Sequence, residues 1–226
     1  MAENVLTIST DDLFSLGAKF NTSESVENEV NELDEVMAGD GDYACSHEYD
    51  ARTDYRQVAA YCGGAAPDIE TDLGALLSTF GAVANSKLPT GLSIAFEAGK
   101  AAVVTVEGHQ HTANSHTTGL ATFDVTGIIP ASSGLGVPSL ITVDGSVNPV
   151  SATVDIAMTH HDGLAADGTH GTTGQHTCRV DLSVQYEGHP SGVTAGNWLD
   201  VKIEKTKTND GLPVATLTAH QYVDKA

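Results

Sequence analysis

Leu92-Ser-Ile-Ala-Phe96 and Ala102-Val-Val-Thr-Val-Glu107 are the stretches that decide the fold class of this chain. Both are rich in apolar and β-branched residues, which is typical of strands. A polar segment, Gly108–Gly119, follows them, and Leu120–Val125 has the composition of a third strand. This region therefore predicts a long hairpin with a polar loop, in a protein that is mainly β.

A similar arrangement recurs about fifty residues later, as the sequence shows. Ser151–Met158 leads into a polar segment over residues 159–176, and Cys178–Tyr186 then alternates apolar and polar residues. Strict alternation predicts a strand with one buried face. Two units of strand, histidine-rich loop and strand suggest a loose internal duplication. The chain as a whole predicts a β-sandwich or barrel with long hairpin loops.

Residues 1–40 predict an acidic, helical N-terminal arm. Thr10–Gly17 resembles a short helix that Thr10 caps. From Ser25 to Met37, apolar residues recur at spacings of four, three and four, which places one stripe on one face of a helix. So narrow a stripe does not stabilise a short helix alone in water, and we expect it to pack on the β body or on another subunit. The predicted interface residues are Val26, Val30, Leu33 and Met37.

Residues 41–226 are expected to form a single β-rich domain that includes a helix near residues 67–81. Pro67 suits the first turn of that helix, since its fixed backbone angle is already helical there. Tyr43–Cys62 predicts two strands joined near residues 50–53, with a helix over Asp54–Tyr61 as the alternative. Trp198–Glu204 and Val214–Tyr222 predict the last two strands.

The chain is strongly acidic, with a net charge of −20. Up to Asp72 it carries seventeen acidic and three basic residues. This charge argues against sequence-specific nucleic-acid binding, which needs Lys and Arg to displace counterions. Neither a secretory signal nor an apolar run of about 18–20 residues is evident, so we expect cytoplasmic synthesis and no membrane partner. Three cysteines lack zinc-site spacing and predict buried thiols, with a Cys45–Cys62 disulfide as the alternative.

Histidines are the candidate metal ligands, because neutral imidazole binds Zn, Cu and Ni. A structural or solvent-exposed role is the alternative for each of them. Asp40-Gly-Asp42 and Asp162–Gly168 are interpreted as turns rather than calcium sites. No nucleophile elbow, phosphate-binding loop or HExxH motif is present, so we expect no catalytic residue, no cofactor and no enzymatic activity. The candidate ligands in the two polar segments are His109, His111, His116, His160, His161 and His176.

The arrangement resembles that of virion structural proteins of tailed bacteriophages, in particular tail-tube subunits. The resemblance rests on the acidic arm up to Gly39, the hairpins at Ala102–Val125 and Ser151–Tyr186, and the helix at Pro67–Phe80. It covers the whole chain as a pattern, without a diagnostic motif. It implies a self-assembling protein that closes into homo-oligomeric, for example hexameric, rings, which stack into a tube with other virion proteins. An acidic lumen would let DNA slide without sticking.

Two other functions stay open at this point. The first is a β-sandwich binding or adhesion module, or a capsid decoration protein, with Gly108–Gly119 and Thr159–Gly174 as its contact surface. The second is a metal-binding protein that uses the histidine-rich loops.

Overall fold

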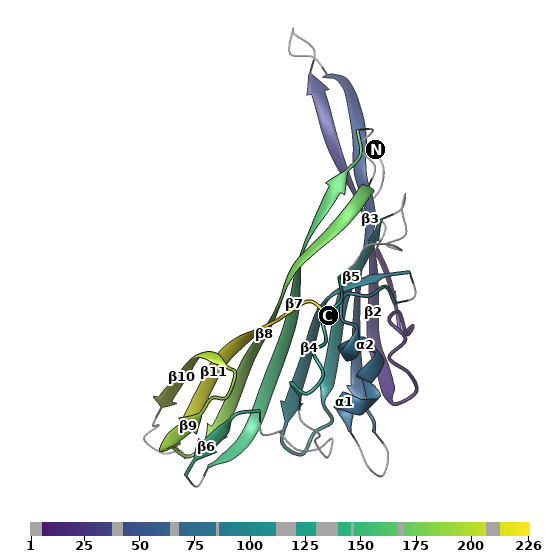
Figure 1. The fold of residues 1–226 in the computed structure, drawn as a ribbon. Coiled ribbons are helices and arrows are strands. Elements are labelled where there is room, and N and C mark those ends of the chain that lie inside the picture. The colour runs from purple at the N-terminus through teal and green to yellow at the C-terminus, as the bar shows by residue number, and fades with distance from the viewer. Residues whose placement is uncertain are drawn as a thin grey trace.

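The computed structural model describes residues 6–37, 43–63, 68–84, 86–111, 121–129, 140–145, 147–166, 170–206 and 213–226. Nine strands form one antiparallel sheet in the order β1-β2-β3-β5-β4-β7-β8-β11-β10, and β6 and β9 form a small second sheet (Figure 1). The prediction of a mainly β protein is confirmed. The strands are β1 (Leu6–Ser9), β2 (Phe20–Met37), β3 (Tyr43–Tyr61), β4 (Leu88–Glu97), β5 (Val103–His111), β6 (Thr142–Asp144), β7 (Asn148–Leu164), β8 (His170–Glu187), β9 (Gly192–Thr194), β10 (Leu199–Thr206) and β11 (Val214–Val223), and the helices are α1 (Ile69–Asp72) and α2 (Gly74–Ser78).

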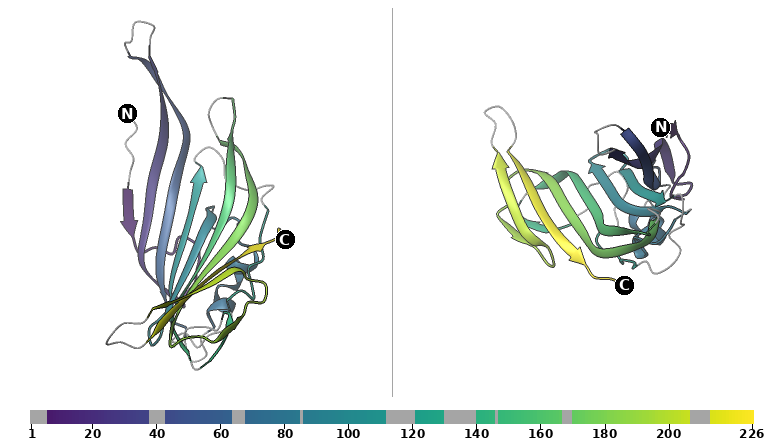
Figure 2. Two further views of the ribbon diagram at one scale, coloured as in Figure 1. Left: turned by 90° about the vertical axis from the view of Figure 1, so that its left-hand side faces the viewer. Right: turned by 90° about the horizontal axis from the view of Figure 1, so that it is seen from above.

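The large sheet is curved but open. Figure 2 shows the curve from above, with the first and last strands of the sheet apart from each other. β1 and β10 are the two edges in the strand order, and they do not pair with each other. The prediction of a closed barrel is therefore wrong, while the sandwich-like alternative with a small second sheet is supported.

One hydrophobic core lies against the central strands. β8 buries Val180, Leu182 and Val184, whereas Ser183 and Gln185 are exposed, as the alternation in the sequence predicts. β4 and β7 contribute further apolar side chains to the same core. Strands of this kind are stabilised by burying one face, so the pattern alone is enough to specify them.

The helix predicted near residues 67–81 is present as two short pieces. Asp68 caps α1, and its carboxylate accepts a hydrogen bond from the backbone N–H of Thr71 at 3.2 Å. Ile69, Leu77 and Phe80 are fully buried in the core. The apolar side chains of this segment thus pack into the core, as expected for a helical segment that covers a sheet.

The predicted helical arm is wrong, because Phe20–Met37 forms strand β2. β2 pairs with β3 from Phe20↔Tyr61 to Met37↔Tyr43, with three register shifts, and this ladder provides backbone hydrogen-bond partners from one end of β2 to the other. A narrow apolar stripe gives a helix little to bury, and this long ladder outweighs it. The segment predicted as a helix over Thr10–Gly17 contains turns instead. β3 is one continuous strand, so the turn expected at residues 50–53 and the alternative helix over 54–61 are also wrong.

Two hairpins extend beyond the rest of the sheet. β3 pairs with β5 only from Arg52 onward, so residues 31–37 and 43–51 form a two-stranded first ribbon. Residues 159–164 and 170–177 form a second ribbon between β7 and β8. Both ribbons project in the same direction (Figures 1 and 2). The histidine-rich loop predicted over residues 159–176 is thus largely strand.

The third predicted strand, Leu120–Val125, and the cysteines are the remaining expectations about the fold. Leu120–Val125 forms no strand in its described part, and Phe123 makes only isolated bridges to Phe80 and Lys225. Cys62 and Cys178 are free thiols. Cys45 lies on β3, and Cys62 follows the end of that strand. The seventeen positions between them correspond to roughly 55 Å of extended strand, which excludes a disulfide between them within one chain.

Candidate functional site

Two pairs of potential metal ligands meet where β5 and β7 run past the start of β4. His109 and His111 lie at the C-terminal end of β5, and His160 and Asp162 lie on β7. Residues two apart on a strand point to the same face, so each pair is presented together. β4 separates β5 from β7 in the sheet, and its first residue, Leu88, pairs with His109. The last residue of β7 that pairs with β4 is Ala157, opposite Gly91. The cluster therefore bridges β5 and β7 beyond the start of the strand that separates them.

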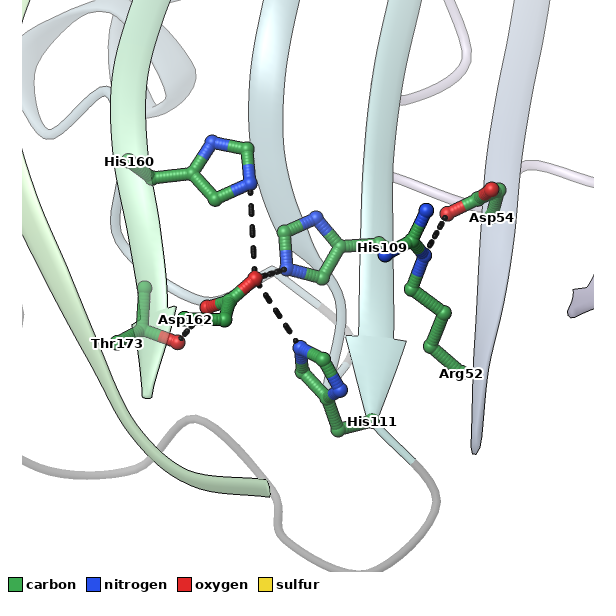
Figure 3. Close-up of polar contacts among 7 residues, drawn as sticks. All are labelled: Arg52, Asp54, His109, His111, His160, Asp162 and Thr173. Carbon is green, nitrogen blue, oxygen red and sulfur yellow. Dashed lines mark hydrogen bonds and ion pairs between the residues drawn. The ribbon is translucent and has the colours of Figure 1, made fainter. Parts of the chain in front are cut away.

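Three imidazoles converge on one carboxylate oxygen (Figure 3). The Nε2 atoms of His111, His109 and His160 lie 3.2, 3.5 and 3.7 Å from Asp162 Oδ2. The ligand atoms of His109, His111 and Asp162 all lie within 4.8 Å of one another, and these residues form the candidate metal-binding group found in the described part of the chain. The ring centroids of His109 and His160 are 4.8 Å apart.

The cluster is largely withdrawn from water. The side chain of His111 is 0% exposed, His109 is buried, and Asp162 is mostly buried. Burial acts to raise the pKa of Asp162, but hydrogen bonds from His109, His111 and Thr173 outweigh it and hold that pKa well below its usual range. Asp162 is therefore a carboxylate at neutral pH, which is the form that binds cations.

His160 is neutral at the same pH. Burial lowers the pKa of His160, and the charge of His109 lowers it further, while Asp162 acts in the opposite direction. A neutral imidazole has a free lone pair on one ring nitrogen, so His160 has the protonation state of a metal ligand.

The neighbouring strands orient this group. The hydroxyl of Thr173 on β8 donates a hydrogen bond to Asp162 Oδ1, so that Oδ2 faces the histidines. On β3, Arg52 Nε donates to Asp54 Oδ1 at 3.1 Å, next to His109 in Figure 3. An open pocket of about 400 Å³ borders the cluster and gives solvent access to it; its lining includes Arg52, Asp54, His109, His160 and Asp162.

The structure brings together three of the six histidines predicted as ligands. His161 and His176 are exposed on β7 and β8, and neither belongs to the candidate metal-binding group. His116 lies outside the described residues. Asp162 was interpreted from the sequence as part of a turn, yet it is the centre of the cluster. The signal that identifies it is the spacing His160-x-Asp162, which matches His109-x-His111 on a second strand.

The predicted interface residues Val26, Val30, Leu33 and Met37 all lie on β2. Because this segment is a strand and not a helix, the helical stripe expected from the spacing of these residues does not exist. The exposed large apolar residues of the described chain are found elsewhere: Leu6 and Ile8 on β1, Val103 on β5, Leu199 on β10 and Tyr222 on β11.

In the described residues, we find no helix with the length and apolar character that a membrane span requires. No protein-family model matches the chain, and no curated protein is significantly similar to it in sequence.

Proposed function

We propose that this chain is a self-assembling structural protein without enzymatic activity, and that it serves as a tail-tube-like subunit of a virion. The observation that carries the proposal is the open sheet, whose two edge strands both expose apolar side chains. Leu6 and Ile8 on β1 are 61% and 67% exposed, and Leu199 on β10 is 50% exposed. Apolar side chains in such positions favour contact with another chain.

The chemistry of the edges supports assembly through strand pairing. An edge strand carries backbone N–H and C=O groups that can pair with a second chain, and soluble proteins usually discourage this with charges, prolines or bulges. β1, Leu6-Thr-Ile-Ser9, has no charge and no proline. β10 does carry charges, including Lys202 and Glu204. The contact that these edges favour is pairing of β1 in one copy with β10 in the next copy.

Such a contact joins two different surfaces of the same protein. Contacts of this kind generate closed rings when the rotation between copies closes, and open filaments when it does not. Six copies per ring, as in the family that the sequence resembles, is the subunit number we propose to test.

The projecting ribbons also favour neighbours. A two-stranded ribbon is marginally stable alone in water and gains stability when a further strand or surface covers it. The first ribbon, residues 31–37 and 43–51, continues β2 and β3 past the last pairing of β3 with β5. In stacked rings, ribbons that project in one direction reach the adjacent ring. The net charge of −20 would keep DNA from adhering to a lumen.

The test is negative-stain electron microscopy of the untagged protein across concentration and salt, combined with light scattering. We expect wild type to form rings or tubes. Ile8→Lys places a charge on the exposed edge and should keep the protein monomeric with an unchanged melting temperature. Ala95→Lys adds the same charge at an exposed position of the central strand β4, and this control variant should still assemble.

Two results would contradict the proposal. If wild type stays monomeric under all conditions, the protein does not self-assemble and the proposal is wrong. Assembly of Ile8→Lys at wild-type concentrations would show that β1 is not the contact.

A further inference from the structure

The cluster around Asp162 suggests a function that assembly does not require. His109 and His111 come from β5, and His160 and Asp162 come from β7, which are not neighbours in the sheet. The four side chains nevertheless gather their polar atoms around one point (Figure 3). Burying an ionised carboxylate is costly unless a partner compensates its charge.

The distances in the cluster are also compatible with the ligand separations around a bound ion. An imidazole that donates to a carboxylate lies at about 2.7–2.9 Å in a strong, charge-assisted contact. The three Nε2 atoms lie at 3.2, 3.5 and 3.7 Å from Asp162 Oδ2. Ligands about 2.0–2.1 Å from a tetrahedral zinc ion are separated from each other by about 3.3–3.4 Å. The three distances from Asp162 Oδ2 bracket that value, and the ligand atoms of His109, His111 and Asp162 all lie within 4.8 Å of one another.

We propose that His109, His111 and Asp162 bind one Zn²⁺ ion, with His160 as the fourth ligand. Imidazole and carboxylate are ligands that zinc accepts, whereas Ca²⁺ and Mg²⁺ require mainly oxygen ligands. A single carboxylate among the ligands leaves the dication partly compensated, and the acidic protein adds a favourable long-range potential.

Thr173 supports the site without contacting the ion. Its hydroxyl occupies Asp162 Oδ1 and leaves Oδ2 directed at the histidines. Partners that orient a ligand in this way typically change metal affinity by about 10–100-fold when they are removed. The open pocket of about 400 Å³ beside His109, His160 and Asp162 provides a path for the ion.

The role that follows is structural. The ion would connect the end of β5 to β7 at the base of the second ribbon, residues 159–164 and 170–177. It would thereby fix the direction in which that ribbon projects. Four protein ligands leave no open position for a substrate, which is the arrangement of structural zinc sites.

The proposal is tested on the full-length protein, treated with a chelator and dialysed, by titration calorimetry with zinc chloride alone. We expect one ion per chain and a higher melting temperature in its presence. Cobalt chloride should give the intense visible absorption of tetrahedral Co²⁺. Asp162→Asn and His109→Asn should abolish binding, and Thr173→Val should weaken it by about 10–100-fold.

Matched controls separate the site from general effects. His161→Ala removes an exposed histidine next to His160, and Thr172→Val changes the exposed threonine next to Thr173. Both should bind zinc like wild type. Absence of stoichiometric zinc binding by folded wild type overturns the proposal, and so does binding that survives Asp162→Asn but is lost in His161→Ala. Circular dichroism identifies any variant that fails to fold. In that case the Co²⁺ spectrum of wild type decides whether a tetrahedral metal site is present.

Discussion

The hydroxyl of Tyr61 donates a hydrogen bond to Asp72 Oδ2 at 2.6 Å. The contact ties the last residue of β3 to the last residue of α1. Burial raises the pKa of Tyr61 to about 12, and the hydrogen bond to Asp72 contributes to the rise. Tyr61 therefore stays protonated and serves as a donor over the whole physiological range.

Tyr61→Phe should lower the free energy of unfolding by about 1–3 kcal/mol, because it removes a hydrogen bond to a charged group and keeps the buried ring. The ring contact with Phe20, 5.2 Å between centroids, is retained. Urea unfolding measures the change. Tyr222→Phe is the control: Tyr222 is exposed, and its change should stay within about 0.5 kcal/mol. Equal effects of the two substitutions would contradict the interpretation.

The same pair predicts a pH dependence. Hydrogen bonds from Lys19 and from Tyr61 hold the pKa of Asp72 below its usual range. A carboxyl group with a lower pKa in the folded state stabilises the protein fully above its unfolded pKa, about 3.9, and this contribution is lost as the pH falls through the folded pKa.

The stability difference between wild type and Asp72→Asn should therefore shrink as the pH falls from about 7 to about 3. Urea unfolding of both proteins at several pH values measures it. The other acidic residues titrate in both proteins and cancel in the difference. A difference that stays constant with pH would show that the Asp72 charge contributes nothing.

Gln57 lies at the centre of a buried polar network and is 0% exposed. Its Oε1 accepts from the backbone N–H of Phe14 at 3.0 Å, and its Nε2 donates to Thr22 Oγ1 at 2.8 Å and to Asp12 Oδ1 at 3.0 Å. Gln57→Leu should cost about 1–3 kcal/mol or more, since it leaves the Phe14 donor buried and unsatisfied. Thermal and urea unfolding measure the loss. Gln185→Leu, at an exposed site on β8, should be near neutral, and a neutral Gln57→Leu would contradict the network.

Gly108 allows a close approach between β5 and β4. A Cβ at this position would lie 2.4 Å from the carbonyl oxygen of Leu88 and 3.0 Å from the ring of Phe14. Gly108→Ala should destabilise the protein by about 1–3 kcal/mol, because backbone atoms must shift. Gly91→Ala, where the nearest atom is 3.6 Å away, is the matched control and should be tolerated. Similar melting temperatures for the two variants would refute the close approach.

Assembly should depend on pH through the net charge. The sequence pI is about 4.5, so repulsion between copies weakens as the pH falls toward that value. Light scattering of wild type should increase from about pH 7 to about pH 5, and added salt should have the same effect at neutral pH by screening. Scattering that does not change under either condition would count against assembly limited by repulsion.

The sequence predicted the strands that bury one face and missed those that do not. Val180, Leu182 and Val184 alternate with polar residues, and this pattern predicts a strand with one face buried on the core. β2 carries acidic residues on both sides of a few valines, so its periodicity suits a helix as well as a strand. Only the pairing with β3 over its full length decided the matter. The loop predicted over residues 159–176 was wrong for the same reason, because β7 and β8 pair with each other beyond the core.

By itself, the sequence determined the mainly β class, the sign and size of the charge, and the presence of paired histidines two residues apart. Each of these depends on local composition or spacing. Tertiary structure decided that β4 begins at Leu88, opposite His109, so that β5 and β7 can bring His111 and Asp162 together. It also decided that the sheet stays open, with β1 and β10 at its edges. Contacts between residues some fifty positions apart depend on strand order and register, which the hydrophobic pattern of one strand does not specify.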